Sequence, residues 1–579
     1  MSERLDLRAQ LDDAVDVNDQ LAAVAALRSR AAELRDDGMT QCRLAVLTGY
    51  TSTLLTDLVF GHAWLRGVKL ETMESGFGLF EQVLLAEDPA FSAWKPDVVY
   101  FCVGLEHFAL DSVDAEVARW KRLWEKARAL YGCDVVMNTV VEPRYRTYGN
   151  YELKVEGSVG RKVAELNLAL AREAPSYVHL HDVSFLASNL GKDQMFDPKW
   201  HAVAKLPANL ACLPAYAKSV AGVIAAIRGK SKKCLVLDLD DTLWGGVVGD
   251  DGVDGVRLGA ESAEGESFVR FQTYVKSLAA RGVLLAVCSK NDDAIARAVF
   301  TQRPEMVLTL TDISAFVANW EPKDQGLRAI AAALNVLPES MVFVDDSPAE
   351  CALVRSRMPE VAVVELPRDP SRYCEALAAH AFFEPIAISN EDRQRAASFQ
   401  AEGARAALAG ESASYADYLA SLKMETTIRA WRPDESPRVT QLLAKTNQFN
   451  LTGRRYTDPQ VRALLDDADV VPLCLDLRDR FGDYGLVSVL IGRCSGDVCA
   501  IECWVMSCRV FKRGVEETMF AHVRAELARR GVRTVRGTLV PTPRNGYVTD
   551  LFASLGFTRE HGDSDHEQRW ELPLSEEQA

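Results

Sequence analysis

Residues 234–246 read CLVLDLDDTLWGG, a short apolar run followed at once by three carboxylates and a hydroxyl. The apolar run has the length and composition of a strand buried on both faces of a sheet. Asp238 and Asp240 come at its carboxyl end, where open α/β sheets bind their ligands. Residues two apart on an extended chain point to the same side, so both carboxylates face one ligand. Because close carboxylates repel unless they share a cation or a proton, the stretch predicts a divalent-cation site; an acidic turn after a strand is the alternative.

The residues that follow repeat the pattern of a strand and then a helix. Apolar runs predict further strands, with helical segments between them, at residues 283–288, 306–310, 341–344 and 361–366. This alternation with short turns predicts a doubly wound parallel sheet. Ser289, Asp345 and Asp346 come directly after predicted strands, and Lys323 lies in the stretch NWEPKD. Four groups of polar residues therefore accompany one sheet.

The composition narrows the class of protein. The chain has 579 residues, of which 48% are apolar and 26% charged, values typical of globular proteins. Its net charge of −16 argues against binding to nucleic acid or an anionic membrane by charge. The 13 cysteines are scattered, the first residues are charged, and no apolar run reaches the roughly 18 residues that a membrane span needs. We expect a cytoplasmic, reduced protein with no membrane and no nucleic-acid partner.

The length and the changes of pattern predict three folded units and one connector. An α/β domain is predicted at residues 1–228 and the doubly wound domain at residues 229–380. A helical connector rich in Ala, Ser, Glu and Arg follows at residues 381–425, and a mixed α+β domain at residues 426–579. The chemistry is predicted to lie in the second of them.

The order of carboxylates, hydroxyl, lysine and carboxylates resembles the haloacid dehalogenase (HAD) superfamily of phosphatases. The resemblance implies that Asp238 is the nucleophile that accepts a phosphoryl group. It implies that Asp240 is the general acid and then the general base. Thr242, Ser289 and Lys323 would bind the phosphoryl oxygens.

The same resemblance implies a Mg²⁺ site. Asp238, Asp345 and Asp346 would supply carboxylate ligands, and Asp240 would supply its backbone carbonyl. The stretches LDLDDTLWGGVVGDDGVDGVRLG, LAVCSKND, NWEPK and VFVDDSP are similar to the FkbH-like proteins of HAD subfamily IIIC. The fold expected from it is a HAD-like sheet flanked by an SGNH-hydrolase-like α/β domain and a GNAT-like α+β domain.

FkbH-like proteins act in polyketide biosynthesis, so the resemblance implies a substrate and a partner. The substrate would be 1,3-bisphosphoglycerate, from which a glyceryl unit is captured and phosphate removed. The partner would be a phosphopantetheinylated acyl carrier protein that receives the glyceryl unit. Two alternatives stay open: a small-molecule phosphatase, and a non-catalytic scaffold that binds carrier proteins.

Cys288 is the candidate acyl acceptor, because it immediately precedes Ser289 at the end of a predicted strand. A thiolate attacks an acyl phosphate readily, and Lys290, Lys323 or the metal would favour the thiolate. The alternative is a small buried core residue, which is a common role for cysteine in strands. Cys234, in the strand before Asp238, is expected to be core.

The N-terminal domain departs from the pattern of an active SGNH hydrolase. It has Gly49-Tyr50-Thr51-Ser52 in place of Gly-Asp-Ser, and Asp197-Pro-Lys-Trp-His201 has one residue too many for the later motif. A Ser52–His201 catalytic pair is one interpretation, and a degenerate scaffold that docks a partner is the favoured one.

The C-terminal domain departs from the GNAT pattern as well. Arg509–Gly514 lies where a pyrophosphate would bind a helix N-terminus, but Lys512 stands where a glycine is expected. The stretch NQFNLTGRRYT at residues 447–457 is interpreted as a surface loop and helix start in preference to a phosphopantetheine contact. Arg454 with Arg455, or Lys512 with Arg513, are candidate basic patches for an acidic carrier protein.

Overall fold

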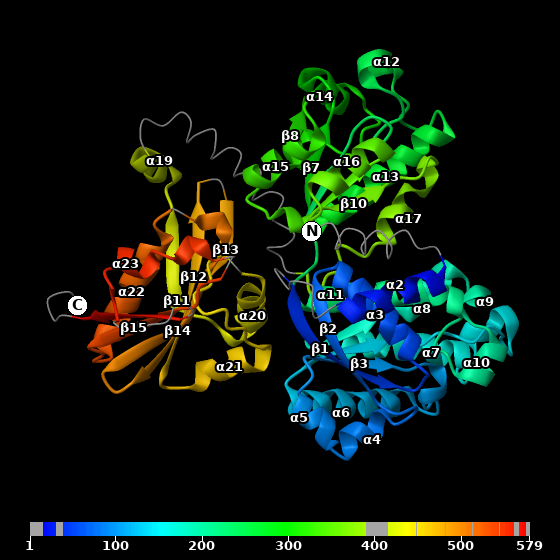
Figure 1. Ribbon diagram of the computed structural model, residues 1–579, viewed down its shortest axis with the longest axis horizontal. Coiled ribbons are helices and arrows are strands. Elements are labelled where there is room, and N and C mark those ends of the chain that lie inside the picture. Colours follow the sequence, from blue (N-terminus) through cyan, green and yellow to red (C-terminus); the bar gives the residue numbers. More distant parts are fainter. Residues whose placement is uncertain are drawn as a thin grey trace. The chain divides into compact units, whose positions relative to one another are not determined.

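The structure is a computed structural model that describes residues 16–30, 39–388, 415–446, 448–480, 482–511, 513–542, 545–560 and 567–574. These residues form three separate sheets, one in each of the three predicted folded regions (Figure 1). Lys512 and Asn447, which carried sequence predictions, lie outside the described residues, as does most of the predicted connector. Its described part includes the helix α19 (Tyr415–Leu422).

The first sheet is parallel, with strand order β2-β1-β3-β4-β5. Its strands are β1 (Thr40–Thr48), β2 (Val68–Glu74), β3 (Val98–Cys102), β4 (Asp134–Asn138) and β5 (Val178–His181). Alternate residues of β1 enter opposite cores: Leu44 and Val46 pack with one set of helices, and Ala45 and Leu47 with another. The predicted α/β class is therefore confirmed for this region.

Helices cover both faces of this sheet. One face carries α2 (Val17–Arg30), α3 (Thr53–Leu65) and α11 (Leu213–Ile227), and the other carries α4 (Phe80–Leu85), α6 (Val113–Tyr131) and α7 (Val159–Glu173) (Figure 1). The shorter elements are α5 (Pro89–Trp94), η2 (Gly149–Lys154), α8 (Val183–Leu190), α9 (Lys192–Met195) and α10 (Pro198–Ala204). Residues 210–227 are long and apolar enough to cross a membrane, but 56% of that window is buried inside the protein, as in a core helix.

The second sheet has the strand order β10-β9-β6-β7-β8. Its strands are β6 (Cys234–Leu237), β7 (Leu284–Ser289), β8 (Ile313–Ala318), β9 (Met341–Asp345) and β10 (Ala362–Glu365). The pairs β6–β7, β7–β8 and β9–β10 are parallel. The helices between the strands are α12 (Val248–Gly255), α13 (Ala263–Ala280), α14 (Asp293–Gln302), α15 (Lys323–Ala333) and α16 (Pro348–Arg357).

The strand predicted at residues 306–310 is wrong, because β8 begins only at Ile313. The Gln272 side chain on α13 accepts hydrogen bonds from the backbone N–H groups of Val307 and Leu308 at 2.9 and 3.2 Å. A side chain thus satisfies donors that a neighbouring strand would otherwise have paired. Leu308 is buried without being in the sheet. Burial outside a sheet also favours apolar residues, so the apolar run was mistaken for a strand.

The third sheet is mostly antiparallel, with strand order β11-β12-β13-β14-β15-β17-β16. Its strands are β11 (Glu425–Ala430), β12 (Val470–Asp479), β13 (Gly482–Ser495), β14 (Val498–Met506), β15 (Thr534–Leu539), β16 (Thr558–Arg559) and β17 (Gln568–Pro573). The helices are α20 (Ser436–Lys445), α21 (Asp458–Asp466) and α22 (Val515–Arg529), with the short α23 (Leu551–Ser554). This mixture agrees with the predicted α+β class.

The first part of the stretch predicted as a surface loop and helix start is core, whereas residues 453–455 are exposed and α21 begins directly after Thr457. Phe449 and Leu451 are buried in the main core of the region, and Asn450 forms an antiparallel bridge with Val505 of β14. The backbone of Leu451 also accepts a hydrogen bond of 2.8 Å from Val540, just after β15. Main-chain pairing with two strands therefore buries the apolar half of this stretch.

Candidate phosphoryl-transfer site

A buried ion pair forms the centre of the site. Asp238 directly follows β6, and Lys323 is the first residue of α15. Both side chains are buried, and the Lys323 Nζ lies 2.9 Å from Asp238 Oδ1. Burying two charges is costly unless they are paired, so this contact is needed for the fold to tolerate them. It also places an ammonium group beside the predicted nucleophile.

Three carboxylates gather at the same place. Asp238, Asp345 and Asp346 each offer a ligand oxygen, and these oxygens lie within 4.8 Å of one another. The backbone N–H of Ser347 donates to Asp345 Oδ1 at 2.8 Å and orients that carboxylate. An all-oxygen donor set of this charge suits Mg²⁺ or Ca²⁺ better than a soft metal. The residues present therefore fit a hard divalent cation.

The Asp240 carboxylate is held by three hydrogen-bond donors. Its Oδ1 accepts from Trp244 Nε1 at 2.9 Å and from the backbone N–H of Val248 at 3.1 Å. Its Oδ2 accepts from Asn291 Nδ2 at 2.8 Å. Burial raises the pKa of Asp240 above its usual value, while these hydrogen bonds act in the opposite direction. A raised pKa suits a carboxyl group that has to give and take a proton.

The third acid of the motif has a different position. Asp241 has a positive φ of 50°, and its Oδ1 accepts a hydrogen bond of 2.7 Å from the backbone N–H of Gly246. The same oxygen lies 3.6 Å from the Arg257 guanidinium. Asp241 therefore stabilises the turn after the strand.

Ser289, at the end of β7, and Thr242, in the turn that follows β6, are both buried. Ser289 ends β7, which is hydrogen-bonded to β6, and its backbone oxygen accepts a hydrogen bond of 3.1 Å from Asn319 N–H. The backbone N–H of Thr242 donates to Leu239 O at 3.1 Å, as part of the turn that contains Asp240. Their predicted phosphate-binding roles stay predictions.

The Cys288 thiol is turned toward α15. Its Sγ donates to the backbone oxygen of Lys323 at 3.6 Å, and a Cβ added to Gly326 would lie only 2.7 Å from it. The residue is 2% exposed. The thiol is thus buried against the start of α15, and its predicted acyl-acceptor role stays a prediction. Cys234 is fully buried as expected, and burial raises the pKa of its thiol to about 12.

Comparison with known proteins agrees with this geometry. Residues 43–225 match the family described as FkbH, N-terminal domain. The chain is also similar to the N-terminal part of the protein BF1531 from Bacteroides fragilis, which contains a phosphatase domain and is complexed with Mg. The identity is 32%, the match covers 62% of this chain and 98% of that one, and the TM-score is 0.58. The chain belongs to the FkbH-like proteins of the HAD superfamily.

Two acetyltransferase structures match a smaller part of this FkbH-like protein more weakly. They are the ribosomal-protein-S18-alanine N-acetyltransferase from Escherichia coli and the GNAT domain of S. lividans PAT, at 16% and 15% identity. Each match covers 26% of this chain and 95% or 90% of the other, with TM-scores of 0.21 and 0.22. Likeness at this level says nothing about the activity of this chain. No curated protein matches the chain.

In the N-terminal region of the FkbH-like protein, Ser52 and His201 have different partners. Ser52 is buried and its hydroxyl donates to Glu74 Oε2 at 2.5 Å, whereas His201 Nε2 lies 3.4 Å from Glu106 Oε1. A serine whose proton is held by a carboxylate is not activated by the histidine. The structure therefore does not bring this candidate pair together, and the SGNH-like assignment stays a prediction.

The predicted basic patches are engaged within the C-terminal region. Arg513 is buried, with its Nη1 2.5 Å from Tyr484 Oη and 3.7 Å from Asp479 Oδ2. Arg455 donates to the backbone oxygens of α20 and the residue after it, and Arg454 lies 3.3 Å from Glu502. These contacts hold Arg454, Arg455 and Arg513 within the C-terminal region, and their predicted role in docking an acidic carrier protein stays a prediction.

Asn291 and Trp244, which donate hydrogen bonds to Asp240, were not predicted as site residues. Their positions in the sequence could have indicated a place near the site, because Asn291 lies two residues after Ser289 and Trp244 lies four residues after Asp240. Which atom each side chain contacts depends on the loops that bring them together.

Proposed function

We propose that this FkbH-like protein is a Mg²⁺-dependent phosphatase and glyceryltransferase. The observation that carries the phosphatase part is the buried Lys323–Asp238 pair beside a cluster of three carboxylates. The similar phosphatase-domain protein complexed with Mg supports the choice of metal. Asp238, Asp345 and Asp346 would hold the ion, which when bound neutralises charge on the phosphoryl group.

The chain's own residues account for both halves of phosphate-ester hydrolysis. An Asp238 oxygen attacks phosphorus, the bond to the leaving oxygen breaks, and Asp240 gives that oxygen its proton. Water then attacks the aspartyl phosphate while Asp240 takes up the water's proton, which releases phosphate and restores the Asp238 carboxylate. Lys323 balances the negative charge that accumulates beside Asp238.

The proposed substrate and acceptor are the glyceryl unit of 1,3-bisphosphoglycerate and a phosphopantetheinylated acyl carrier protein. A thiolate attacks the acyl carbon, the carbon–oxygen bond to phosphate breaks, and a thioester forms; exchange with the carrier thiol then releases the first thiolate. Support for these partners is the resemblance to FkbH-like proteins. For Cys288 to be the first thiol, the start of α15 has to move away from its sulfur.

The decisive experiment incubates the protein with 1,3-bisphosphoglycerate, Mg²⁺ and holo-carrier protein and measures intact masses. A carrier that gains one glyceryl unit supports the whole proposal, whereas free phosphate with no gain supports the phosphatase alone. The absence of both phosphate release and glyceryl transfer would support the alternative of a non-catalytic scaffold that binds carrier proteins. Covalent glyceryl on a Cys288→Ala enzyme would eliminate that cysteine as the acceptor.

The matched pair Asp238→Asn and Asp241→Asn tests the site itself. Both substitutions remove one carboxylate charge from the same loop, but Asp241 contacts Gly246 and Arg257 on the turn side. We expect phosphate release to be lost in the first variant and kept in the second. Equal loss in both would contradict the assignment of Asp238.

A further inference from the structure

The N-terminal region contains a cavity of about 420 Å³ that none of the chemistry above uses. Its lining includes Glu142, Arg144 and Arg146 from the segment after β4, and Gly191 and Lys192 around the start of α9. β4 belongs to a parallel sheet, and open α/β sheets bind ligands beyond the carboxyl ends of their strands. The cavity is thus lined by the segment that follows the carboxyl end of β4.

Three basic side chains of this cavity are held in fixed positions. The Arg146 guanidinium makes two hydrogen bonds to Glu142, at 2.7 and 3.0 Å, and Lys192 Nζ donates to the same carboxylate at 3.1 Å. The hydrogen bonds from Arg146, and to a smaller extent the hydrogen bond from Lys192, hold the pKa of Glu142 below its usual value. One ionised carboxylate therefore positions two cations, which leaves the group of three with net positive charge.

The third cation is held differently. Arg144 Nη1 donates to the backbone oxygen of Phe196 at 2.8 Å and lies 3.4 Å from Asp193, whose side chain is 92% exposed. Asp193 also lines the cavity, so the five charged side chains of the lining, three basic and two acidic, carry a net charge of +1. In a chain of net charge −16, a cavity with three oriented cations is a local exception.

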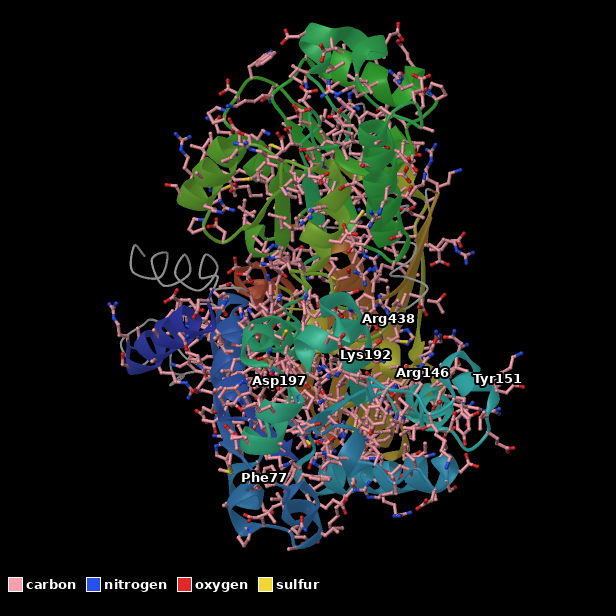
Figure 2. All side chains as sticks on the ribbon, turned by 90° about the vertical axis from the view of Figure 1, so that its right-hand side faces the viewer. Phe77, Arg146, Tyr151, Lys192, Asp197 and Arg438 are labelled. Carbon is pink, nitrogen blue, oxygen red and sulfur yellow. The ribbon has the colours of Figure 1, made fainter. Side chains whose placement is uncertain are left out.

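The space between these groups is open, and its neighbourhood exposes aromatic rings. A Cβ added at Gly191 would meet no heavy atom within 4 Å. The segment after β4, which supplies Arg144 and Arg146, also exposes Tyr145, Tyr148 and Tyr151, with Tyr145 82% exposed; Figure 2 labels Tyr151, Arg146 and Lys192.

We propose that this cavity binds the phosphate group of an organic phosphate, with the neighbouring tyrosines contacting the organic part of the ligand. Arginine forks and a lysine are the donors that phosphate oxygens prefer, and Glu142 orients two of them in advance. Positioning before binding reduces the entropy cost of capture. The phosphopantetheine arm of a carrier protein and a free organic phosphate share this chemistry, and the first of these sources rests on the proposed function.

Isothermal titration of the full chain with inorganic phosphate tests the cavity. Because the central site also binds phosphate in the proposed mechanism, the informative quantity is the difference between wild type and Arg144→Gln/Lys192→Gln. We expect phosphate to bind the cavity of the double variant at least about tenfold more weakly than that of the wild type, because the charge-assisted hydrogen bonds from Arg144 and Lys192 are lost. One binding event then disappears from the isotherm. Identical isotherms would overturn the proposal.

Controls separate this site from folding and from the central chemistry. Lys154→Gln removes the same charge from the same region, where Lys154 lies over the Tyr151 ring, and is expected to bind like wild type. Thermal unfolding and hydrolysis of p-nitrophenyl phosphate are expected to be unchanged in all variants, so this proposal and the phosphatase proposal can fail separately. Should the double variant not fold, Lys192→Gln alone makes the same test.

The two sources are distinguished by further probes. Phosphopantetheine is expected to bind and pantetheine is not; equal binding would show that the phosphate is not recognised and would refute the proposal. Tighter binding of a holo-carrier protein than of free phosphopantetheine supports the carrier arm as the ligand. Equal affinity supports a free organic phosphate in the same cavity.

Discussion

Replacing Lys323 by methionine removes the ammonium group that lies 2.9 Å from Asp238 and keeps an unbranched apolar side chain that is one atom shorter. At this separation the Coulomb attraction is about 6 kcal/mol at an effective dielectric constant of 20. Desolvation offsets part of it, and breaking a buried pair by removing one partner costs about 3–5 kcal/mol. Asp345 and Asp346 are adjacent, so the uncompensated charge is larger than that of a single carboxylate.

The measurement is hydrogen exchange of peptides from β6 and α15, which reports the local opening free energy. We expect Lys323→Met to lower protection by about two to three and a half orders of magnitude in a metal-free buffer. Millimolar Mg²⁺ is expected to restore part of the protection, because a cation again neutralises the carboxylates.

The matched control is Lys276→Met in the same sheet domain. Lys276 is 43% exposed and pairs with Asp312 at 3.2 Å, and exposed pairs contribute only about 0–1 kcal/mol. Unchanged protection in Lys323→Met, or equal losses in both variants, would refute the electrostatic account of the site. A Lys323→Met protein that loses protection but does not respond to Mg²⁺ would refute the metal site alone.

Three other predictions test separate parts of the structure. Trp244→Phe removes a donor to Asp240, and because that hydrogen bond is to a charged acceptor, kcat for phosphate release should fall by about tenfold or more with little change in KM. Gly326→Ala should destabilise the wild type by about 1–3 kcal/mol in urea unfolding through its clash with Cys288, yet stabilise the Cys288→Ala protein by about 1 kcal/mol through helix propensity. Burial lowers the pKa of His181 to about 4, so the unfolded state binds more protons than the folded state below about pH 6.5. The free energy of unfolding of the first-sheet region should therefore fall by about 2 kcal/mol from pH 7 to pH 5. Hydrogen exchange of β5 measures this slope, which His181→Gln should flatten.

The sequence by itself determined the class of fold and where polar residues gather. Strand-length apolar runs ending in Asp238, Ser289 and Asp345 are enough to place these residues at one edge, because parallel strands share the direction of their carboxyl ends. The proximity of Asp238, Asp345 and Asp346 in the structure agrees with that inference. The HAD-like character of the central region followed from the same local patterns.

Only the tertiary structure decided which way individual groups face and which of them meet. The orientation of Cys288 depends on the helix packed against β7, and the hydrogen bonds from Asn291 and Trp244 to Asp240 depend on how two loops fold over one strand end. The Gln272 side chain pairs with the backbone N–H groups of Val307 and Leu308, which lie 35 and 36 positions later in the chain and outside the sheet. Apart from the Trp244–Asp240 bond, these contacts join residues distant in sequence. No local pattern of polarity encodes them, because they arise from packing between elements whose register is fixed only in the folded protein.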